Sequence, residues 1–330
     1  MSEVVQFRGK ERSSGVEFYR IIAMILICMS HAAQTFFYKY AIPDTLLNGI
    51  FLFFRDCLGQ TGNLIFIICS SYFLIDSNNV KGNKVIKILL DSAIISVLIY
   101  LGFLIGGYKF SFMESISHFL PDFFSNMWFI PIYVLFYMIH PMLNAAINGV
   151  SRKTHLTFCV IVFVFYGFGG LLFGWSLGMD PLVRFAAVYI LVAYFKRYHG
   201  EVCESRKINK AVFTISAFLF VFLAAVKYFF KLRIIILSQF YSPILFPLIF
   251  SGFNLLRTKK FYNKPVNYLA SCSLYFYCIH ENLLIRQYLR ADFYDYFMSR
   301  KSNFAGGGYR IYPSLFCDLA CLRIPTVFAV

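Results

Sequence analysis

The stretch EFYRIIAMILICMSHAAQTFF, residues 17–37, decides the fold. It is apolar over about 20 residues, the length that a helix needs to cross the hydrocarbon core of a bilayer. It also contains Glu17, Arg20 and His31. A charge at the centre of a bilayer costs about 2.5–3.5 kcal/mol, so ionisable residues there indicate a function or a specific partner. The stretch therefore predicts a membrane-spanning helix with a polar face.

Blocks of this kind recur along the chain. Hydrophobic residues make up 59% and charged residues 14% of it, whereas a soluble domain carries about 25% charged residues. We therefore predict an all-α, polytopic transmembrane bundle of about nine or ten spans. The predicted spans are 18–38, 50–75, 86–107, 127–147, 156–175, 181–197, 211–231, 234–253 and 267–289. Charges and prolines interrupt the segment after residue 305, so we expect a last span there to be atypical or truncated.

Basic residues set the predicted orientation. With a cytoplasmic N-terminus, the inside segments contain nearly twice as many Lys and Arg residues as the outside segments, as the positive-inside rule requires. Residues 1–17 then form a cytoplasmic segment, and residues 18–330 form a multi-pass domain that we place in the plasma membrane. Lys227, Lys231 and Arg233 are an exception, explained either by a polar outer surface or by a wrong boundary.

The net charge and the cysteines exclude other classes of protein. The charge of +15 lies in short loops between apolar blocks, which favours membrane orientation over binding to nucleic acid. The cysteines show no ligand spacing, and several lie inside apolar blocks, where cysteine acts as a small hydrophobe. We expect neither disulfides nor a metal site.

Arg20 and His31 form the first candidate site. They are eleven residues apart, so on a helix they share one face and lie about 16 Å apart along the axis. Glu17 is one turn before Arg20. Arg20 could instead reach toward the interface and His31 could join two helices by a hydrogen bond. The aligned group favours function, because histidine exchanges protons near neutral pH.

Further candidates lie in other predicted spans. For each of them a structural role is the alternative to a functional one. Arg55 could form an interfacial ion pair with Asp56, and Lys84 and Lys87 could only set the orientation of the chain in the membrane. Trp128 could be an interfacial anchor, and His280 could make a structural hydrogen bond.

The first two spans also resemble a known family. Arg20, ten intervening residues and His31 resemble the R-x10-H signature of the integral-membrane acyltransferase-3 family. NLIFIICSSYFLI (63–75) resembles the second-span pattern of this family; Ser70 matches it, and Ser71 replaces a glycine.

Later segments extend the resemblance in the same order. Lys84 and Lys87 stand where arginines are common in the family. MWFIPIYVLFYMIHP (127–141) and SLYFYCIHENLL (273–284) are similar to two later motifs, so the resemblance covers residues about 12–290.

The resemblance implies an enzyme of ten helices. Such an enzyme is an O-acetyltransferase that takes an acyl group, usually acetyl, from a cytoplasmic acyl-CoA. It delivers the group to a sugar hydroxyl at or beyond the outer face of the membrane, on a polysaccharide or a lipid-linked sugar. The expected partners are therefore acetyl-CoA, a polysaccharide or lipid-linked sugar, the bilayer and proteins of polysaccharide assembly, with no metal.

The implied roles divide the candidates into three groups. The catalytic group contains His31, as base or nucleophile, with Arg20 and Glu17. Binding of the donor phosphates is expected from Arg20, Lys84 and Lys87. The substrate or cavity candidates are Arg55, Ser70, Trp128 and His280.

Two rival functions remain at this point. A transporter or flippase of a lipid-linked sugar would have similar spans, but such proteins often have two related halves and discontinuous helices, which the sequence does not reveal. In a sensor or structural membrane protein, Arg20 and His31 would only hold helices together.

Overall fold

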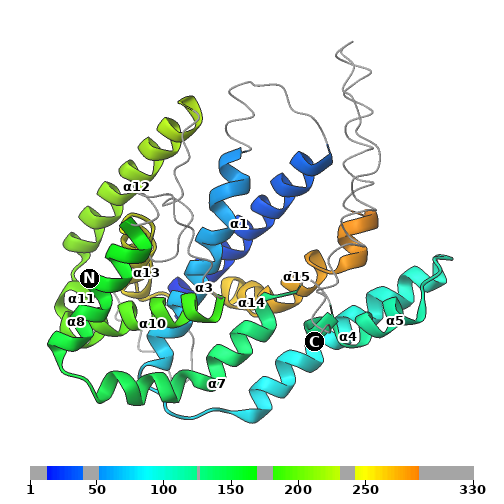
Figure 1. Cartoon of the computed structure of the whole chain (residues 1–330), viewed down its shortest axis with the longest axis horizontal. Coiled ribbons are helices and arrows are strands. Elements are labelled where there is room, and N and C mark those ends of the chain that lie inside the picture. Colours follow the sequence, from blue (N-terminus) through cyan, green and yellow to red (C-terminus); the bar gives the residue numbers. More distant parts are fainter. Residues whose placement is uncertain (1–12, 40–51, 125–126, 169–180, 231–241, 290–330) are drawn as a thin grey trace, which may run out of the picture.

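The computed structural model describes residues 13–39, 52–124, 127–168, 181–230 and 242–289. These residues form helices and connecting turns, with no β-strand among them (Figure 1). The prediction of an all-α membrane bundle is confirmed. The segment after residue 305, expected to be atypical, lies outside the described residues.

Five helical segments in the described part are long and apolar enough to cross a membrane. They are α1 (Ser14–Lys39), η1 with α3 (Phe54–Leu58 and Gly59–Leu74), α4 (Gly82–Ile105), α7 (Phe129–Asn148) and α12 (Arg206–Phe229). Each coincides with a predicted span. The remaining helices are α5 (Phe112–Phe119), α6 (Pro121–Phe124), α8 (Arg152–Ile161), η2 (Val162–Phe168), α10 (Pro181–Tyr198), α11 (Gly200–Glu204), α13 (Leu245–Arg257), α14 (Lys264–Ser271), α15 (Ser273–His280) and η4 (Ile285–Leu289).

The outer helices expose large apolar side chains. On α4 and α12 these include Ile94, Leu98, Phe218 and Val221. In water such surfaces would be costly, but in a bilayer they face lipid tails. The exposed apolar faces thus fit a membrane environment.

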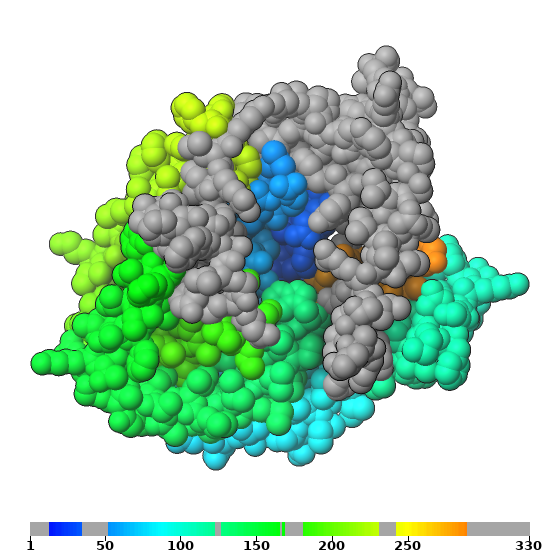
Figure 2. All heavy atoms as spheres, in the orientation of Figure 1, coloured from blue at the N-terminus to red at the C-terminus, as the bar shows by residue number. Residues whose placement is uncertain are grey.

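Helices α1 and α3 cross at the centre of the molecule and are visible in the middle of the face shown in Figure 2. A Cβ added at Gly62 of α3 would lie 2.5 Å from the carbonyl oxygen of Ala23 and 2.6 Å from a side-chain carbon of Ile27. Only glycine allows this approach, and small residues are the usual means of close helix packing in membranes. The two backbones therefore meet directly between the levels of Arg20 and His31.

The segments predicted to be cytoplasmic gather at one end of the bundle. Ser14 at the start of α1 donates a hydrogen bond of 2.8 Å to Asn267 of α14. Asn144, near the end of α7, donates 2.9 Å to the carbonyl of Ser77, and Arg257 pairs with Glu204 at 2.8 Å. These contacts fit the alternating directions of the predicted spans. The side of the membrane on which this end lies stays a prediction.

The segment between α4 and α7 folds back along α4. The hydroxyl of Tyr100 donates to Ser115 of α5 at 2.9 Å, and Ser92 donates to Asp122 of α6 at 3.1 Å. The segment that contains α5 and α6 therefore runs antiparallel to α4. This connection between two predicted spans is itself helical, and it leads the chain back to the middle of α4.

The predicted span 267–289 is not one continuous helix. It divides into α14, α15 and η4, with breaks at Cys272 and at Glu281 and Asn282. The side-chain oxygen of Asn282 accepts the backbone amide of Leu284 at 3.0 Å, a local bond that competes with the helical pattern. The second break leaves His280 and Glu281 at the end of a helix.

An ion pair accounts for part of the exception to the positive-inside rule. Nζ of Lys227 lies 2.9 Å from Oδ2 of Asp56, whose Oδ1 accepts from Arg55 at 2.7 Å. Asp56 belongs to the π-helical turn η1, and such turns redirect side chains. Lys227 therefore has a carboxylate partner across the bundle, whereas Lys231 and Arg233 lie outside the described residues.

We expect Lys227→Ala to lower stability by about 1–3 kcal/mol, because the partly buried carboxylate of Asp56 loses a charged hydrogen-bond donor. Thermal unfolding of the purified protein in detergent measures the change. Exposed Lys207→Ala is the control. The double variant Asp56→Asn with Lys227→Met should recover part of the loss, and an unchanged midpoint for Lys227→Ala would show that the pair contributes nothing.

Candidate active site

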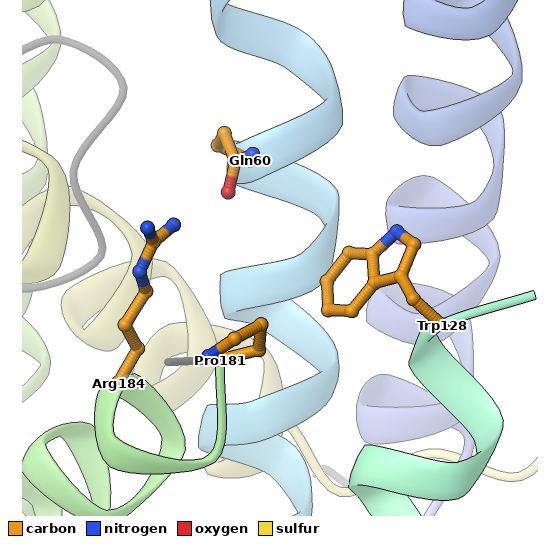
Figure 3. Close-up of a pocket in the computed structure, with 4 residues that line it drawn as sticks. All are labelled: Gln60, Trp128, Pro181 and Arg184. Carbon is orange, nitrogen blue, oxygen red and sulfur yellow. The ribbon is translucent and has the colours of Figure 1, made fainter. Parts of the chain in front are cut away.

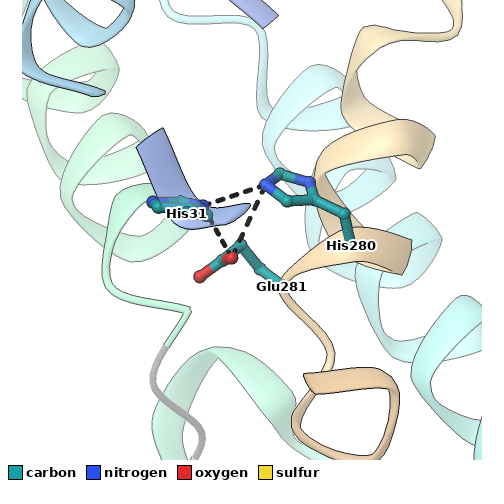
Figure 4. Close-up of side chains that lie close together, drawn as sticks. All are labelled: His31, His280 and Glu281. Carbon is teal, nitrogen blue, oxygen red and sulfur yellow. Dashed lines mark hydrogen bonds and ion pairs between the residues drawn. The ribbon is translucent and has the colours of Figure 1, made fainter. Parts of the chain in front are cut away.

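His31, His280 and Glu281 meet inside the bundle, although 249 residues separate the two histidines (Figure 4). Nδ1 of His31 lies 2.7 Å from Oε1 of Glu281 and 3.1 Å from Nε2 of His280. Nε2 of His280 lies 3.5 Å from the same carboxylate oxygen. The carboxylate is buried, with 7% of its side chain exposed, whereas 22% of His31 is exposed. The cluster therefore has a buried anion beneath a partly accessible imidazole.

Neighbouring contacts fix the depth of this cluster. Asn282 lies 3.4 Å from the hydroxyl of Ser96, near the middle of α4. On the other side, the hydroxyl of Ser30 donates to the carbonyl of Arg55 at 3.0 Å and ties α1 to η1. Because α4 is long enough to span a bilayer, the cluster lies well inside the membrane region.

Hydrogen bonding assigns the tautomer of each ring. Nδ1 of His280 lies 3.0 Å from the carbonyl of Phe276, which can only accept, so this nitrogen carries a hydrogen. Neutral His280 then presents a lone pair at Nε2. Because both Glu281 and His280 accept, Nδ1 of His31 is the donor to them. Nε2 of His31 is left with the lone pair that a proton acceptor needs.

The same three side chains are also a possible ligand set for a metal. Their donor atoms all lie within 4.8 Å of one another, and two histidines with a carboxylate are a known zinc set. The centroids of the two imidazole rings lie 5.3 Å apart, and the facing nitrogens lie 3.1 Å apart. The difference is about twice the distance from a ring centroid to its nitrogen, as expected when both nitrogens lie on the line between the rings. The two nitrogens thus point at each other, which suits a shared hydrogen. The expected absence of a metal stays a prediction.

Arg20 and Glu17 form a separate pair nearer the start of α1. Their side chains meet at 3.0 Å, and the guanidinium lies 6.0 Å from the centre of the Phe66 ring. Glu17 is buried and Arg20 is partly exposed. The expected contact between these two residues is present, and it orients the guanidinium.

The other predicted site residues have partners of their own. Nζ of Lys84 lies 4.4 Å from the ring centre of Tyr137, and Lys87 pairs with Asp91 at 2.9 Å. Both lysines are exposed on the first turns of α4.

Two further candidates bind neighbouring side chains within the bundle. The Ser70 hydroxyl contacts that of Tyr133 at 3.2 Å, and Arg55 binds Asp56. Neither contact adds to the histidine cluster.

Trp128, which immediately precedes α7, lines a cavity together with Gln60, Pro181 and Arg184 (Figure 3). The indole lies on one side of α3, and the Arg184 side chain rises from the start of α10 on the other. The predicted role of Trp128 as a substrate or cavity residue stays a prediction.

Sequence reasoning missed Glu281 and Gln60. Glu281 follows His280 directly in SLYFYCIHENLL, and a carboxylate beside a candidate histidine was the available signal. Its partnership with His31 depends on the break that ends α15. Gln60 carries no comparable signal in sequence, because amides are common at such positions.

Comparison with known proteins decides the family. Residues 14–308 match the model of a family described as an acyltransferase domain. The chain belongs to this acyltransferase-3 family. It is a membrane acyltransferase, and its helices α1 to η4 lie inside the matched region. No curated protein and no solved structure gives a significant match.

We expect Glu281→Gln to slow acyl transfer by about 100-fold or more, the scale of a lost acid–base contribution. Glutamine keeps the shape but supplies no anion to stabilise a protonated His31. The measurement is the initial rate in membranes containing equal amounts of protein. Glu201, an exposed carboxylate 3.7 Å from His199, provides the matched control Glu201→Gln. Full activity of Glu281→Gln would remove the carboxylate from the mechanism.

Proposed function

We propose that this membrane acyltransferase is an O-acetyltransferase. It takes acetyl from cytoplasmic acetyl-CoA and delivers it to a hydroxyl of a polysaccharide or lipid-linked sugar at the outer side of the plasma membrane. The contact between His31 and Glu281 carries the proposal, because it prepares an imidazole for proton transfer at membrane depth.

The proposed step uses the lone pair on Nε2 of His31. This nitrogen takes the proton of the acceptor hydroxyl, while the hydroxyl oxygen forms a bond to the acetyl carbonyl carbon. The carbon–sulfur bond of the thioester then breaks, and the CoA sulfur leaves and takes the proton from His31. Glu281, 2.7 Å from Nδ1, stabilises the imidazolium that forms between these events, as in other histidine–carboxylate pairs.

The same nitrogen can alternatively attack the thioester itself. An acetyl-histidine would then form before the acceptor hydroxyl takes the acetyl group. The two routes differ in a measurable way, since only the second leaves acetyl on the protein when donor is supplied without acceptor. Mass spectrometry of the peptide containing His31 distinguishes them.

The donor is proposed to enter from the end of the bundle near Arg20. The guanidinium suits a phosphate group because it donates several hydrogen bonds in a fixed plane. Glu17 orients it at 3.0 Å. Lys84 and Lys87, exposed at the start of α4, are proposed to attract the nucleotide phosphates through their charge.

The family match favours this function over a transporter or flippase. One structural feature, the divided helix α14–α15, is also found in transporters. Transport alone, however, does not require a histidine oriented by a carboxylate at 2.7 Å.

We expect His31→Ala to reduce acetate on the surface polysaccharide by at least about 100-fold, because the variant loses the imidazole that contacts Glu281 at 2.7 Å and serves as the proposed base. Acetate released by mild alkali from purified polysaccharide gives the measurement, at matched expression. His199→Ala is the control, since His199 lies on the surface beside Glu201. Normal acetate content in the His31 variant would exclude the mechanism, and loss of activity in a chelator would indicate a required metal.

We expect acetyl-CoA to raise the thermal midpoint of the purified protein, whereas ATP at equal ionic strength should not. Ligand at about 100 times its Kd adds about 2.7 kcal/mol to stability. The variant Arg20→Ala and the double variant Lys84→Ala/Lys87→Ala should each weaken this protection. Lys207→Ala/Lys210→Ala is the matched control for the second. Equal protection by ATP would argue against a specific donor site.

A further inference from the structure

A cavity of about 320 Å³ is separate from the histidine cluster and has no part in the proposed proton transfer. Gln60, Trp128, Pro181 and Arg184 line it (Figure 3); we call it the Trp128 pocket. Its four lining residues come from α3, α10 and the residue before α7. It therefore lies where three of the predicted spans meet.

The α3 side of the pocket is close to His31 in depth. Gly59 immediately precedes Gln60, and a Cβ added at Gly59 would lie 2.7 Å from the hydroxyl of Ser30. Ser30 immediately precedes His31. Gln60 and His31 are thus each one residue away from the same helix contact.

On the α7 side, a series of aromatic ring contacts leads from Trp128 to the histidine cluster. The Phe129 ring lies 5.8 Å from that of Trp128 and 5.8 Å from that of Tyr277. The ring of Tyr277 lies 5.7 Å from that of His280. Two rings therefore connect the indole of Trp128 to the histidine cluster.

The lining combines two kinds of chemistry. Trp128 is 41% exposed and offers a flat apolar ring face. Sugars present flat apolar C–H faces to such rings. Gln60 and Arg184 offer an amide and a guanidinium, which bind hydroxyl and carboxylate oxygens. An aromatic platform facing hydrogen-bonding side chains is suited to a sugar ring.

We propose that the Trp128 pocket binds one sugar ring of the acceptor, stacked on the indole and oriented by Gln60 and Arg184. This inference rests on the proposed function, because it names the place from which the acceptor hydroxyl reaches His31. Ligand pockets usually measure about 300–1,000 Å³. A volume of about 320 Å³ is at the small end of this range and is enough for one sugar ring, so the rest of a longer acceptor would extend outside.

The chain permits a direct binding measurement. It contains two tryptophans, Trp128 and Trp175, so Trp175→Phe leaves Trp128 as the only indole reporter. The purified variant in nanodiscs is titrated with methyl glycosides of glucose, galactose, N-acetylglucosamine and glucuronic acid. Glycerol, which has hydroxyls but no ring, is the ligand control. Trp128→Phe, which retains Trp175, is the protein control.

We expect a saturable change in Trp128 fluorescence with at least one glycoside and none with glycerol. A response to all four would indicate stacking as the main contribution, and a response to the glucuronide alone would indicate an anionic sugar held by Arg184. Trp128→Ala should raise the KM for the responding glycoside by about tenfold, the effect of losing one aromatic contact. Arg184→Gln should raise it further for the glucuronide than for a neutral sugar.

The failures of the two proposals are distinguishable. If acetyl-CoA protects the protein and acetylation proceeds, but no glycoside changes the fluorescence and Trp128→Ala acetylates polysaccharide normally, the pocket proposal is wrong and the enzyme proposal stands. If the glycosides bind while acetyl-CoA neither protects nor donates, the pocket is a sugar site and the proposed enzyme function is wrong.

Discussion

The pairing of one buried carboxylate constrains this membrane bundle more than any other contact at its candidate site. Glu281 lies at membrane depth, where an unpaired charge is costly. His31 at 2.7 Å and Arg286 at 3.4 Å supply its positive or donating partners. These contacts hold the first helix against the last described crossing. They also depend on α15 ending at His280. If the helix continued, Glu281 and Arg286 would follow the helical path and lie elsewhere.

A second constraint holds the other wall of the site. Helices α1 and α3 approach so closely at Gly62 that a Cβ would overlap the backbone of Ala23. This contact positions the Glu17–Arg20 pair and His31 on α1, because a helix in backbone contact with its neighbour can neither rotate nor slide freely. The catalytic proposal therefore depends on a glycine that carries no chemistry itself.

The sequence predicted those features that depend on local pattern. Hydrophobic length located the spans near α1, α3, α4, α7 and α12, and helical periodicity placed Arg20 and His31 on one face. It could not predict the pairing of His31 with Glu281, because no periodic signal connects residues on the first and last crossings. The division of the last span was equally hidden. Its apolar composition resembles that of an unbroken helix, and the break depends on the Asn282 contacts with Ser96 and Leu284.

Taken together, the two constraints limit the route that a donor can follow. Arg20 and His31 both lie on α1, about 16 Å apart along its axis, and both are partly exposed. Between their levels, α1 and α3 are in contact at Gly62. An acyl chain reaching from Arg20 to His31 must therefore pass beside this contact and not through it. In the proposed arrangement the acceptor approaches near Gly59 of α3, which meets Ser30 and precedes Gln60 of the Trp128 pocket. On the proposed arrangement the Arg20 end of α1 serves the donor, the side of α3 near Gly59 serves the acceptor, and His31 lies between them.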